Sequence, residues 1–377
     1  MKIAYVTTYD AMDVRNWSGL AYFMAKSMEE QGMTLEYIGP LETPRSWLWK
    51  GKSFGYRLLG KRFLSNREPA VLKQYAAQVS ARLEKSNANI IFSPGTLPIS
   101  YLDCPQPIAF WTGATFASML NFYPGLTNIS AESIKKGHAA EQRALSHSSL
   151  AIFPSEWGVE GAKSNYVVDP GKVEVVPYGP NLESDFTRQL VKASVKKRLQ
   201  NGCNFLFVGR EWFRKGGDIA LETSKLLRAR GIPTRLWIVG CSPPEEVPDY
   251  VTVYGYLSKR SVESEMLLKQ LYSLATFLIL PSRAENFGVA IAEASSFGVP
   301  SLSADIGGIP SSLQNRRNGM RFPVPINPQQ ICDYVLDLLN SPRKYSALAE
   351  SSFELYQSKL NWKTAGERIR ALFEMLV

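Results

Sequence analysis

The chain has few of the residues that most often bind metals or form disulfides. Its 377 residues include two histidines and four cysteines, and the cysteines are scattered at positions 104, 203, 241 and 332. This spacing indicates neither a zinc site nor a disulfide framework and is typical of a reducing cytoplasm. No Asp-x-Asp pair occurs, so the usual acidic site for a metal ion is also missing.

Long apolar runs are missing as well. No stretch of 18 consecutive apolar residues occurs, so we expect no membrane-spanning helix. The apolar part of the opening MKIAYVTTYD is too short for a signal peptide, and acids follow it. We therefore expect a cytoplasmic protein. With 45% apolar residues, the chain is long enough for two domains with cores of their own.

Short apolar segments alternate with helical segments along most of the chain. This alternation predicts an α/β fold with Rossmann-like, doubly wound domains. Strands are predicted at 3–8, 35–38, 88–93, 108–111, 150–153 and 173–176, and then at 205–209, 235–240, 251–254, 277–280 and 301–303. Helices are predicted at 20–31, 69–85, 134–146, 218–230, 262–274, 286–297, 329–340, 342–359 and 362–376.

The segment 281–310, PSRAENFGVAIAEASSFGVPSLSADIGGIP, follows the buried strand 277–280 and carries two acids. Glu285 and Glu293 would lie about 12 Å apart along an ideal helix. Carboxylates that flank a scissile glycosidic bond lie closer, at roughly 5–9.5 Å. The two acids therefore suit separate points on one elongated ligand. The alternative is an amphipathic helix with two solvated glutamates.

Free amides at the start of this helix would favour an anion between the two acids. A nucleoside diphosphate sugar has this layout, with hydroxyl groups at both ends and phosphates between them. A second basic loop follows the strand 205–209. Its Arg210 and Lys215, beside two glycines, can reach a phosphate. Arg214 is a rival for that phosphate, and a solvated basic loop is the alternative.

The pattern PSRxENFGVxxxEA resembles the E-x7-E signature of retaining glycosyltransferases with the GT-B fold, especially family 4. The resemblance implies that Glu285 lies at the donor sugar and that Glu293 holds the ribose. It also implies that Arg210 and Lys215, in a G-R-x-x-x-x-K-G loop, grip the diphosphate. The other implied donor-site residues are Gly209, Tyr256 and Leu257, together with Asn286, Phe287, Gly288 and Val289.

The same resemblance implies two domains that face each other across a cleft. Residues 1–182 would bind the acceptor, with the helix 362–377 packing back on them, and residues 183–361 would bind the donor. Relatives carry a histidine or an aspartate near 111–116, which this chain does not. His138 and His147 fall on a helix and are more often surface or core residues than catalytic ones. Acceptor-side candidates are Trp17, Ser18, Gly19, Trp111, Thr112 and Thr115.

The net charge of +9 is concentrated in residues 45–73. This segment has one acid, Glu68, and interleaved aromatic residues. A solvated loop with a helix is one interpretation, and a peripheral contact with an anionic membrane, at its cytoplasmic face, is another. Nucleic acid is disfavoured because no recognition motif accompanies the charge. The basic residues are Arg45, Lys50, Lys52, Arg57, Lys61, Arg62, Arg67 and Lys73.

The expected activity is transfer of a sugar from a nucleotide sugar to a hydroxyl acceptor with retention of configuration. A UDP-sugar is favoured as donor and a GDP-sugar comes next, and the acceptor is a lipid, a glycan or a small aglycone. We expect no cofactor and no metal, because Arg210 and Lys215 would stabilise the leaving diphosphate. A nucleotide-sugar epimerase of the same fold and a non-catalytic nucleotide-sugar binding protein are the alternatives. The sequence does not indicate an oligomeric state.

Overall fold

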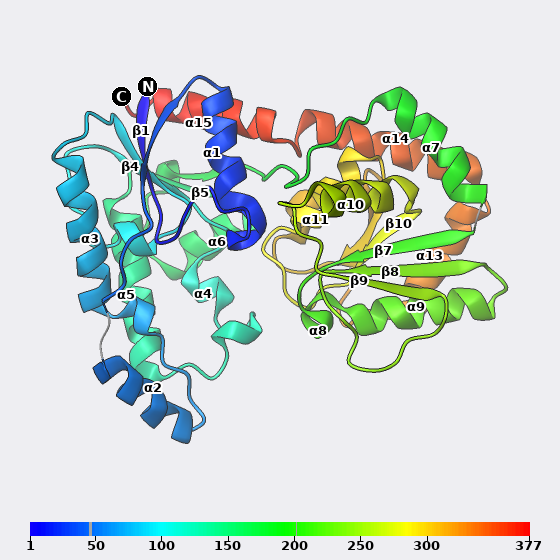
Figure 1. The fold of residues 1–377 in the computed structure, drawn as a ribbon, viewed down its shortest axis with the longest axis horizontal. Coiled ribbons are helices and arrows are strands. Elements are labelled where there is room, and N and C mark those ends of the chain that lie inside the picture. The colour runs from blue at the N-terminus through cyan, green and yellow to red at the C-terminus, as the bar shows by residue number, and fades with distance from the viewer. Residues whose placement is uncertain (45–46, 201) are drawn as a thin grey trace. The chain divides into compact units, whose positions relative to one another are not determined.

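The structure is a computed structural model that describes residues 1–44, 47–200 and 202–377. The chain forms two compact units, each with its own six-stranded sheet (Figure 1). Unit 1 comprises Met1–Val176 and Ala365–Val377, and unit 2 comprises Pro177–Thr364. The predicted α/β class with two Rossmann-like units is confirmed.

The sheet of unit 1 is parallel throughout and has the order β2-β1-β3-β4-β5-β6. The chain runs from β1 outward to β2 and then returns to β3 on the other side of β1. The direction of winding therefore reverses between β1 and β3, and ligands bind beside such a point in open α/β sheets. The strands are β1 (Lys2–Val6), β2 (Thr34–Ile38), β3 (Ile90–Ser93), β4 (Ile108–Trp111), β5 (Leu150–Phe153) and β6 (Val173–Val175).

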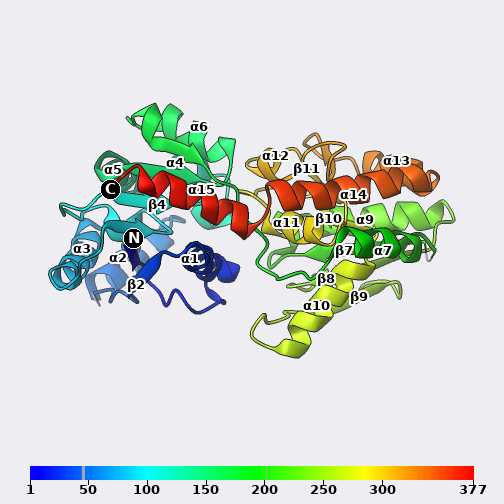
Figure 2. The ribbon, with the colours of Figure 1, turned by 90° about the horizontal axis from the view of Figure 1, so that it is seen from above.

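Helices surround this sheet, and the C-terminal helix completes the unit. The Nη1 atom of Arg370 donates to the carbonyl of Gln31 at 3.1 Å, and the ring of Phe373 lies 6.0 Å from that of Phe92 in β3. The last helix thus packs beside the first one (Figures 1 and 2). The α-helices are α1 (Leu20–Glu30), α2 (Trp47–Leu58), α3 (Pro69–Leu83), α4 (Phe116–Met119), α5 (Ala131–His147), α6 (Glu156–Asn165) and α15 (Trp362–Glu374). Short 3₁₀ turns are η1 (Asn16–Gly19), η2 (Ser65–Arg67), η3 (Leu97–Ile99), η4 (Pro124–Leu126) and η5 (Pro170–Lys172).

The sheet of unit 2 is also parallel and has the order β12-β11-β10-β7-β8-β9. The chain moves from β7 to β8 and β9 and then crosses back to β10 beside β7. Its winding therefore reverses between β7 and β10. The strands are β7 (Cys203–Val208), β8 (Thr234–Val239), β9 (Val251–Gly255), β10 (Phe277–Leu280), β11 (Ser301–Ala304) and β12 (Gly319–Phe322), the last of which was not predicted.

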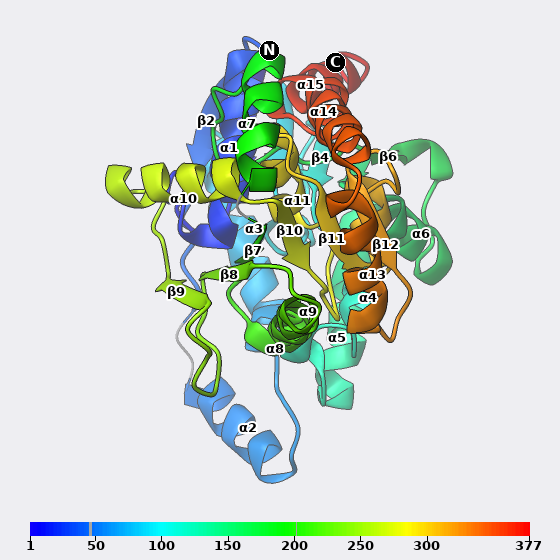
Figure 3. The same ribbon diagram turned by 90° about the vertical axis from the view of Figure 1, so that its right-hand side faces the viewer.

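Two groups of helices cover the sheet of unit 2. α9 packs against α13, whereas α7, α10, α11 and α14 contact one another, and Figure 3 shows the strands between these groups. Because both faces are covered, the central strand β10 is apolar throughout, and every one of its residues is buried. The α-helices are α7 (Arg188–Gln200), α8 (Trp212–Lys215), α9 (Gly217–Ala229), α10 (Val262–Leu274), α11 (Val289–Ser296), α12 (Ile309–Ser312), α13 (Pro328–Leu339) and α14 (Pro342–Ser358).

The helix predicted at 286–297 begins later than expected, at Val289. Gly288 precedes it with a φ of +82°, a left-handed conformation that starts the helix only after the glycine. Asn286 and Phe287 therefore belong to the loop that follows β10. Among the described residues, no helix combines the length and apolar character that crossing a bilayer requires.

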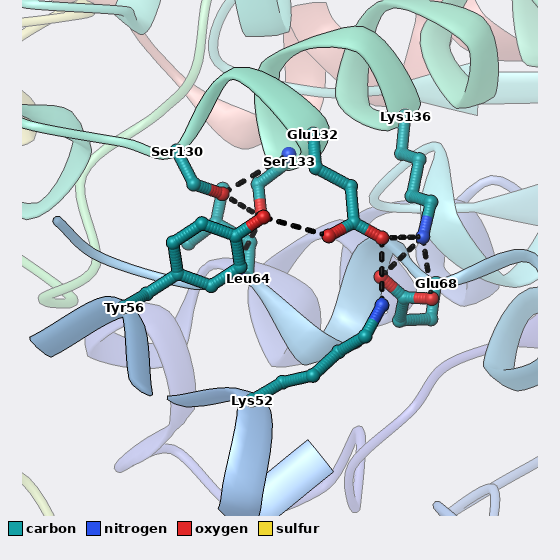
Figure 4. Close-up of polar contacts among 8 residues, drawn as sticks. All are labelled: Lys52, Tyr56, Leu64, Glu68, Ser130, Glu132, Ser133 and Lys136. Carbon is teal, nitrogen blue, oxygen red and sulfur yellow. Dashed lines mark hydrogen bonds and ion pairs between the residues drawn. The ribbon is translucent and has the colours of Figure 1, made fainter. Parts of the chain in front are cut away.

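A network of polar contacts attaches α2 to the body of unit 1 (Figure 4). The carboxylate of Glu132, in the first turn of α5, accepts hydrogen bonds from Lys52 at 2.7 Å and Tyr56 at 2.9 Å. Lys136 donates to Glu132 at 2.5 Å and to Glu68 at 2.8 Å. Hydrogen bonds from Lys136, and then from Lys52, lower the pKa of Glu132 to about 2.

We predict that Glu132→Gln destabilises unit 1 at neutral pH and that this difference from the wild type shrinks in acid. The folded state lowers the pKa of Glu132 from 4.5 to about 2, so its stabilisation is present above pH 4.5 and is lost as the pH falls towards 2. Urea midpoints of both proteins between pH 7 and pH 3 measure the difference. Glu160→Gln, an exposed glutamate of α6, is the matched control, and a difference that stays constant with pH would contradict the prediction.

Candidate functional site

The loops that follow β7 and β10 are packed against each other where the winding of unit 2 reverses. Gly216 has a φ of +77°, and a Cβ atom there would lie 2.1 Å from the carbonyl oxygen of Pro281. Only glycine allows this approach. The amide of Arg283 also donates to the carbonyl of Arg214 at 2.7 Å. The two loops therefore form one backbone platform at the carboxyl ends of the central strands.

This platform brings together Lys215 and Glu285, two of the predicted site residues. The ammonium group of Lys215 donates to Oε2 of Glu285, and both side chains are largely buried. Gly209 lets the lysine pass, because a Cβ atom there would lie 2.7 Å from Cγ of Lys215. Arg214, the predicted rival, donates to the carbonyl of Ala284 at 3.0 Å and so ties the loops together, and its Nη1 atom also lies 3.9 Å from Oε2 of Glu285.

Arg210 and Tyr256 form a second pair beside this platform. The guanidinium carbon of Arg210 lies 4.6 Å from the ring centroid of Tyr256, and the tyrosine is 52% exposed. Such a cation–π contact presents a flat, partly solvated surface. Arg210 follows β7, whereas Tyr256 and the half-buried Leu257 follow β9. The structure therefore places the predicted phosphate-binding arginine next to the predicted base-side tyrosine.

Glu293 has partners of its own within α10 and the turn before it. Lys259 donates to its Oε1 atom at 2.6 Å and Tyr272 to its Oε2 atom at 2.8 Å. Burial, and then the neighbouring Glu293, raise the pKa of Tyr272 well above its usual range, so its phenol stays a hydrogen-bond donor. Glu285 and Glu293 are therefore held by different lysines, as two separate contact points for one ligand would be.

The predicted anion-binding amides at 286–289 need a correction. Phe287 is buried, its ring lies 5.4 Å from that of Tyr178, and its carbonyl accepts a hydrogen bond from the hydroxyl of Ser312. The helix has its N-cap at Gly288, so its free amides begin at Val289 rather than at Asn286. Asn286 and Phe287 shape the loop that carries Glu285.

Unit 1 contains a cavity of about 130 Å³ at its own reversal point. Segments 7–9 after β1 and 93–98 after β3 line it, together with Trp17, Arg67, Thr112, Ala114, Met119 and Glu141. Two of the predicted acceptor-side residues, Trp17 and Thr112, thus line the cavity. Ser18 and Gly19 follow Trp17 in η1 and are not among the lining residues.

The structure corrects the prediction for Trp111 and Thr115. Both are fully buried, and Nε1 of Trp111 donates to the carbonyl of Val176 at 3.1 Å. Thr115 caps α4 by accepting a hydrogen bond from the amide of Ser118 at 3.2 Å. These two side chains are packed inside the fold and do not line the cavity. Trp111 is the last residue of β4, and such a residue can face the core as well as the exit of the strand.

Arg67 and Glu141 were missed as site residues. Arg67 was counted in the surface cluster 45–73 but is 8% exposed, and Glu141 is 2% exposed. The burial of Glu141 could have been predicted from the sequence, because the small residues Gly137, Ala140 and Ala144 place the buried face of α5 around it. No signal in the sequence distinguished Arg67 from the neighbouring surface cations.

Comparison with known proteins finds glycosyltransferases among the proteins that this chain is similar to. Residues 202–341 match the family described as glycosyl transferases group 1. The alpha-D-kanosaminyltransferase of Streptomyces kanamyceticus is 26% identical over 178 residues, which cover 45% of this chain and 44% of that protein. The chain therefore matches less than half of the length of this curated relative.

Solved structures resemble the whole chain. Sucrose-phosphate synthase from Thermosynechococcus elongatus has a TM-score of 0.70 at 16% identity, covering 100% of this chain and 99% of that one. HepE from Anabaena in complex with UDP has a TM-score of 0.69 at 15% identity, with 100% of both chains covered. These likenesses show that the fold is GT-B, and the family match lies within unit 2.

We predict that Tyr272→Phe lowers the free energy of unfolding by about 2 kcal/mol, because a hydrogen bond to a buried charged group contributes about 1.5–3 kcal/mol. Urea unfolding measures this value. In the background of Glu293→Gln the same substitution should cost less, because the carboxylate that the phenol stabilises is gone. Equal costs in both backgrounds would contradict the assigned contact.

Proposed function

We propose that the protein is a retaining glycosyltransferase of family 4 that moves a sugar from a nucleoside diphosphate sugar to a hydroxyl acceptor. A UDP-sugar is the favoured donor and a GDP-sugar the next. The observation that carries this proposal is the pairing of Lys215 with Glu285 at the reversal point of unit 2. An acid and a base that neutralise each other there are poised to take separate parts of one ligand.

In this proposal Lys215 exchanges its partner when the donor binds. Its ammonium group turns from Glu285 to the diphosphate, and Arg210 adds a second positive charge. Glu285 then accepts hydrogen bonds from hydroxyl groups of the donor sugar. The bond between the anomeric carbon and the diphosphate breaks, the acceptor oxygen bonds to that carbon, and the proton of the acceptor hydroxyl passes to the departing diphosphate oxygen. The two cations stabilise the negative charge that develops on the diphosphate. We assign no nucleophilic role to Glu285.

The remaining residues fit the nucleoside end of the donor. Glu293 keeps lone pairs for ribose hydroxyls beyond those used by Lys259 and Tyr272, since a carboxylate has about four acceptor sites. The exposed ring of Tyr256 offers a surface for the base. The complexes of HepE with UDP and UDP-glucose support uridine as the first base to test. Arg210 and Lys215 supply the charge that a metal ion would supply, so we propose metal-independent transfer.

Two alternatives remain within this fold. A nucleotide-sugar epimerase would convert the donor without any acceptor, and a binding protein would hold the donor without any turnover. Product formation that depends on an acceptor separates the transferase from both.

We predict that Lys215→Met weakens UDP binding and that Glu285→Gln retains UDP binding but loses transfer. The lysine faces phosphate in the donor complex and the glutamate faces the sugar, so kcat of Glu285→Gln should fall by about 100-fold or more, the effect of removing one transition-state contact. Thermal shift with UDP, and UDP release with a UDP-sugar and acceptor, measure the two effects with Mg²⁺ and with EDTA.

The matched control is Lys225→Met, an exposed lysine of α9 paired with Glu222. Unchanged kcat in Glu285→Gln would remove its proposed role. A requirement for Mg²⁺ would contradict metal-independent transfer.

The structure also offers a surface for the proposed membrane contact. All of α2 is described, and none of its residues is buried. Trp47, Phe54 and Leu58 recur at a spacing that places them on one face, and they are 80%, 54% and 72% exposed. Lys50 and Arg57 lie beside them on the helix, so the face combines apolar and positive groups, as interfacial helices do. We propose that this face docks on an anionic bilayer at the cytoplasmic side.

This membrane face is smaller than the predicted segment 45–73. Lys52 and Tyr56 point to the opposite side and bind Glu132 (Figure 4). Arg67 is buried, and Arg45 lies outside the described residues. The proposed membrane contact therefore depends on α2 alone. The polar contacts that attach α2 to unit 1 leave its apolar side facing outward.

We predict that the triple change Trp47→Ser, Phe54→Ser and Leu58→Ser abolishes binding to vesicles that contain phosphatidylserine. Burial of each such side chain contributes about 1.5–3 kcal/mol, so the loss should exceed about 100-fold. Co-sedimentation measures it, and Val262→Ser with Met266→Ser, two exposed residues of α10, is the control. Equal sedimentation of all three proteins would contradict the membrane face.

A further inference from the structure

The cavity of unit 1 contains a buried cation that lacks a partner. Arg67 lines the cavity and is 8% exposed. Its Nη1 atom is buried and has no hydrogen-bond partner among the described residues, and no carboxylate of those residues lies within 4.0 Å of the guanidinium. A guanidinium group carries five N–H donors, so removing it from water without an acceptor is costly.

The packing around Arg67 fixes the group without neutralising it. Its guanidinium carbon lies 4.0 Å from the ring centroid of Phe116, which covers one face of the plane and leaves its edge to find an acceptor. Glu141, on the same cavity wall, is occupied by Thr96 at 2.8 Å and by the amide of Phe116 at 3.3 Å. Burial raises the pKa of Glu141 and the charge of Arg67 opposes that rise, so the two groups attract each other at a distance without forming an ion pair.

A second donor in the same cavity is also unused. The hydroxyl of Tyr9 is buried and, within the described part of the chain, has no hydrogen-bond partner. Burial raises the pKa of Tyr9, so the group is a neutral phenol that can donate. The two residues that carry these buried donors, one charged and one neutral, line a space of about 130 Å³. Buried donors of this kind are rare in proteins unless a ligand or water meets them.

The mouth of the cavity is aromatic. Trp17 is 48% exposed, and its ring lies 6.0 Å from that of Tyr9. Trp17 and Ser18 have φ values of +48° and +57°, a left-handed conformation that costs energy in residues other than glycine and is concentrated at ligand sites. The backbone thus holds an indole ring beside the polar cavity at an energetic cost that core packing does not explain.

We propose that this cavity is a ligand site for a carboxylate attached to an apolar or aromatic body. Arg67 and Tyr9 donate to the two carboxylate oxygens, and Trp17 covers the apolar part. The site lies at the carboxyl ends of β1 and β3, where unit 1 reverses its winding. If the proposed glycosyl transfer holds, on which this last step rests, the carboxylate belongs to the acceptor.

The charge of the cavity favours a carboxylate over a phosphate. A phosphate monoester carries a charge of about −1.5 to −2 at neutral pH. Of the described residues that line the cavity, Arg67 is the one cation, and Glu141 stands on the same wall. A monoanion would neutralise the arginine, whereas a dianion would leave charge uncompensated beside a carboxyl group.

Benzoate is the probe, because it combines a carboxylate with an aromatic ring. Benzamide is its neutral counterpart, and phenyl phosphate is the dianion. Calorimetric titration of the full chain with each compound should give benzoate the lowest Kd. Arg67→Met should weaken benzoate at least tenfold and leave benzamide unchanged. Arg143→Met, an exposed arginine of α5 stacked 4.6 Å from the ring of Tyr101, is the matched control and should bind benzoate as the wild type does.

The stability of the variant distinguishes a ligand-binding arginine from a structural one. Because Arg67→Met removes a buried charge that has no carboxylate in direct contact, its melting temperature should equal or exceed that of the wild type. A large fall would mean that Arg67 serves the fold and would overturn the proposal. Equal affinity of the wild type for benzoate and benzamide, or tighter binding of phenyl phosphate, would also overturn it, and neither result depends on a variant.

Titration of the same samples with UDP separates this inference from the proposed function. UDP should bind the wild type and Arg67→Met alike. Binding of UDP without preference for benzoate over benzamide would reject the carboxylate site and leave the donor site intact. Binding of benzoate without UDP would support the carboxylate site and reject the donor site of unit 2.

Discussion

The contact between Gly216 and the carbonyl of Pro281 is the constraint on which the site in unit 2 depends. The strand order places the carboxyl ends of β7 and β10 side by side, and the glycine lets the loops that follow them pack closely. Lys215 precedes Gly216, and Glu285 follows Pro281 by four residues. The ion pair between them is thus a consequence of two backbone loops in contact, and a side chain at position 216 would separate both charges.

The same topological rule produces a different kind of site in unit 1. β1 and β3 also lie at a reversal of winding, and the segments that follow them line the cavity. In unit 2 the charged groups have partners: Lys215 binds Glu285 and Lys259 binds Glu293. In unit 1, by contrast, the part of the chain that the structure describes offers the Nη1 atom of Arg67 no acceptor. The strand order determines where the candidate site of each unit lies, and the side chains determine which ligand groups it suits.

The sequence allowed prediction of what depends on local pattern. Apolar runs located the strands of the described residues except β12, whereas the order of the strands within each sheet, and with it the reversal of winding, came from the structure. Lys215 and Glu285 were each predicted as site residues because both belong to loops after strands, but their pairing was not predicted. The burial of Arg67 could not be anticipated, since it follows from the packing of η2 under Phe116 and α5, which no local pattern encodes. The prediction for Trp111 was wrong for a related reason. The layer packed against the sheet decides which way the last residue of a strand faces.

The difference between paired and unpaired charges determines what each unit requires of a ligand. In the proposed donor site, a ligand phosphate would compete with Glu285 for Lys215. The free energy of binding would then gain only the difference between two charged contacts. The gain becomes larger when hydroxyl groups of the sugar bind the released carboxylate. In the proposed donor site, nucleotide and sugar would therefore reinforce each other, because one takes the lysine and the other takes the glutamate. In the site proposed for unit 1, an anion would meet Arg67 without displacing an acceptor, so a small monoanion would gain the full contact. On these proposals, selectivity in unit 2 arises from exchange of partners, whereas in unit 1 it arises from charge balance in a confined cavity.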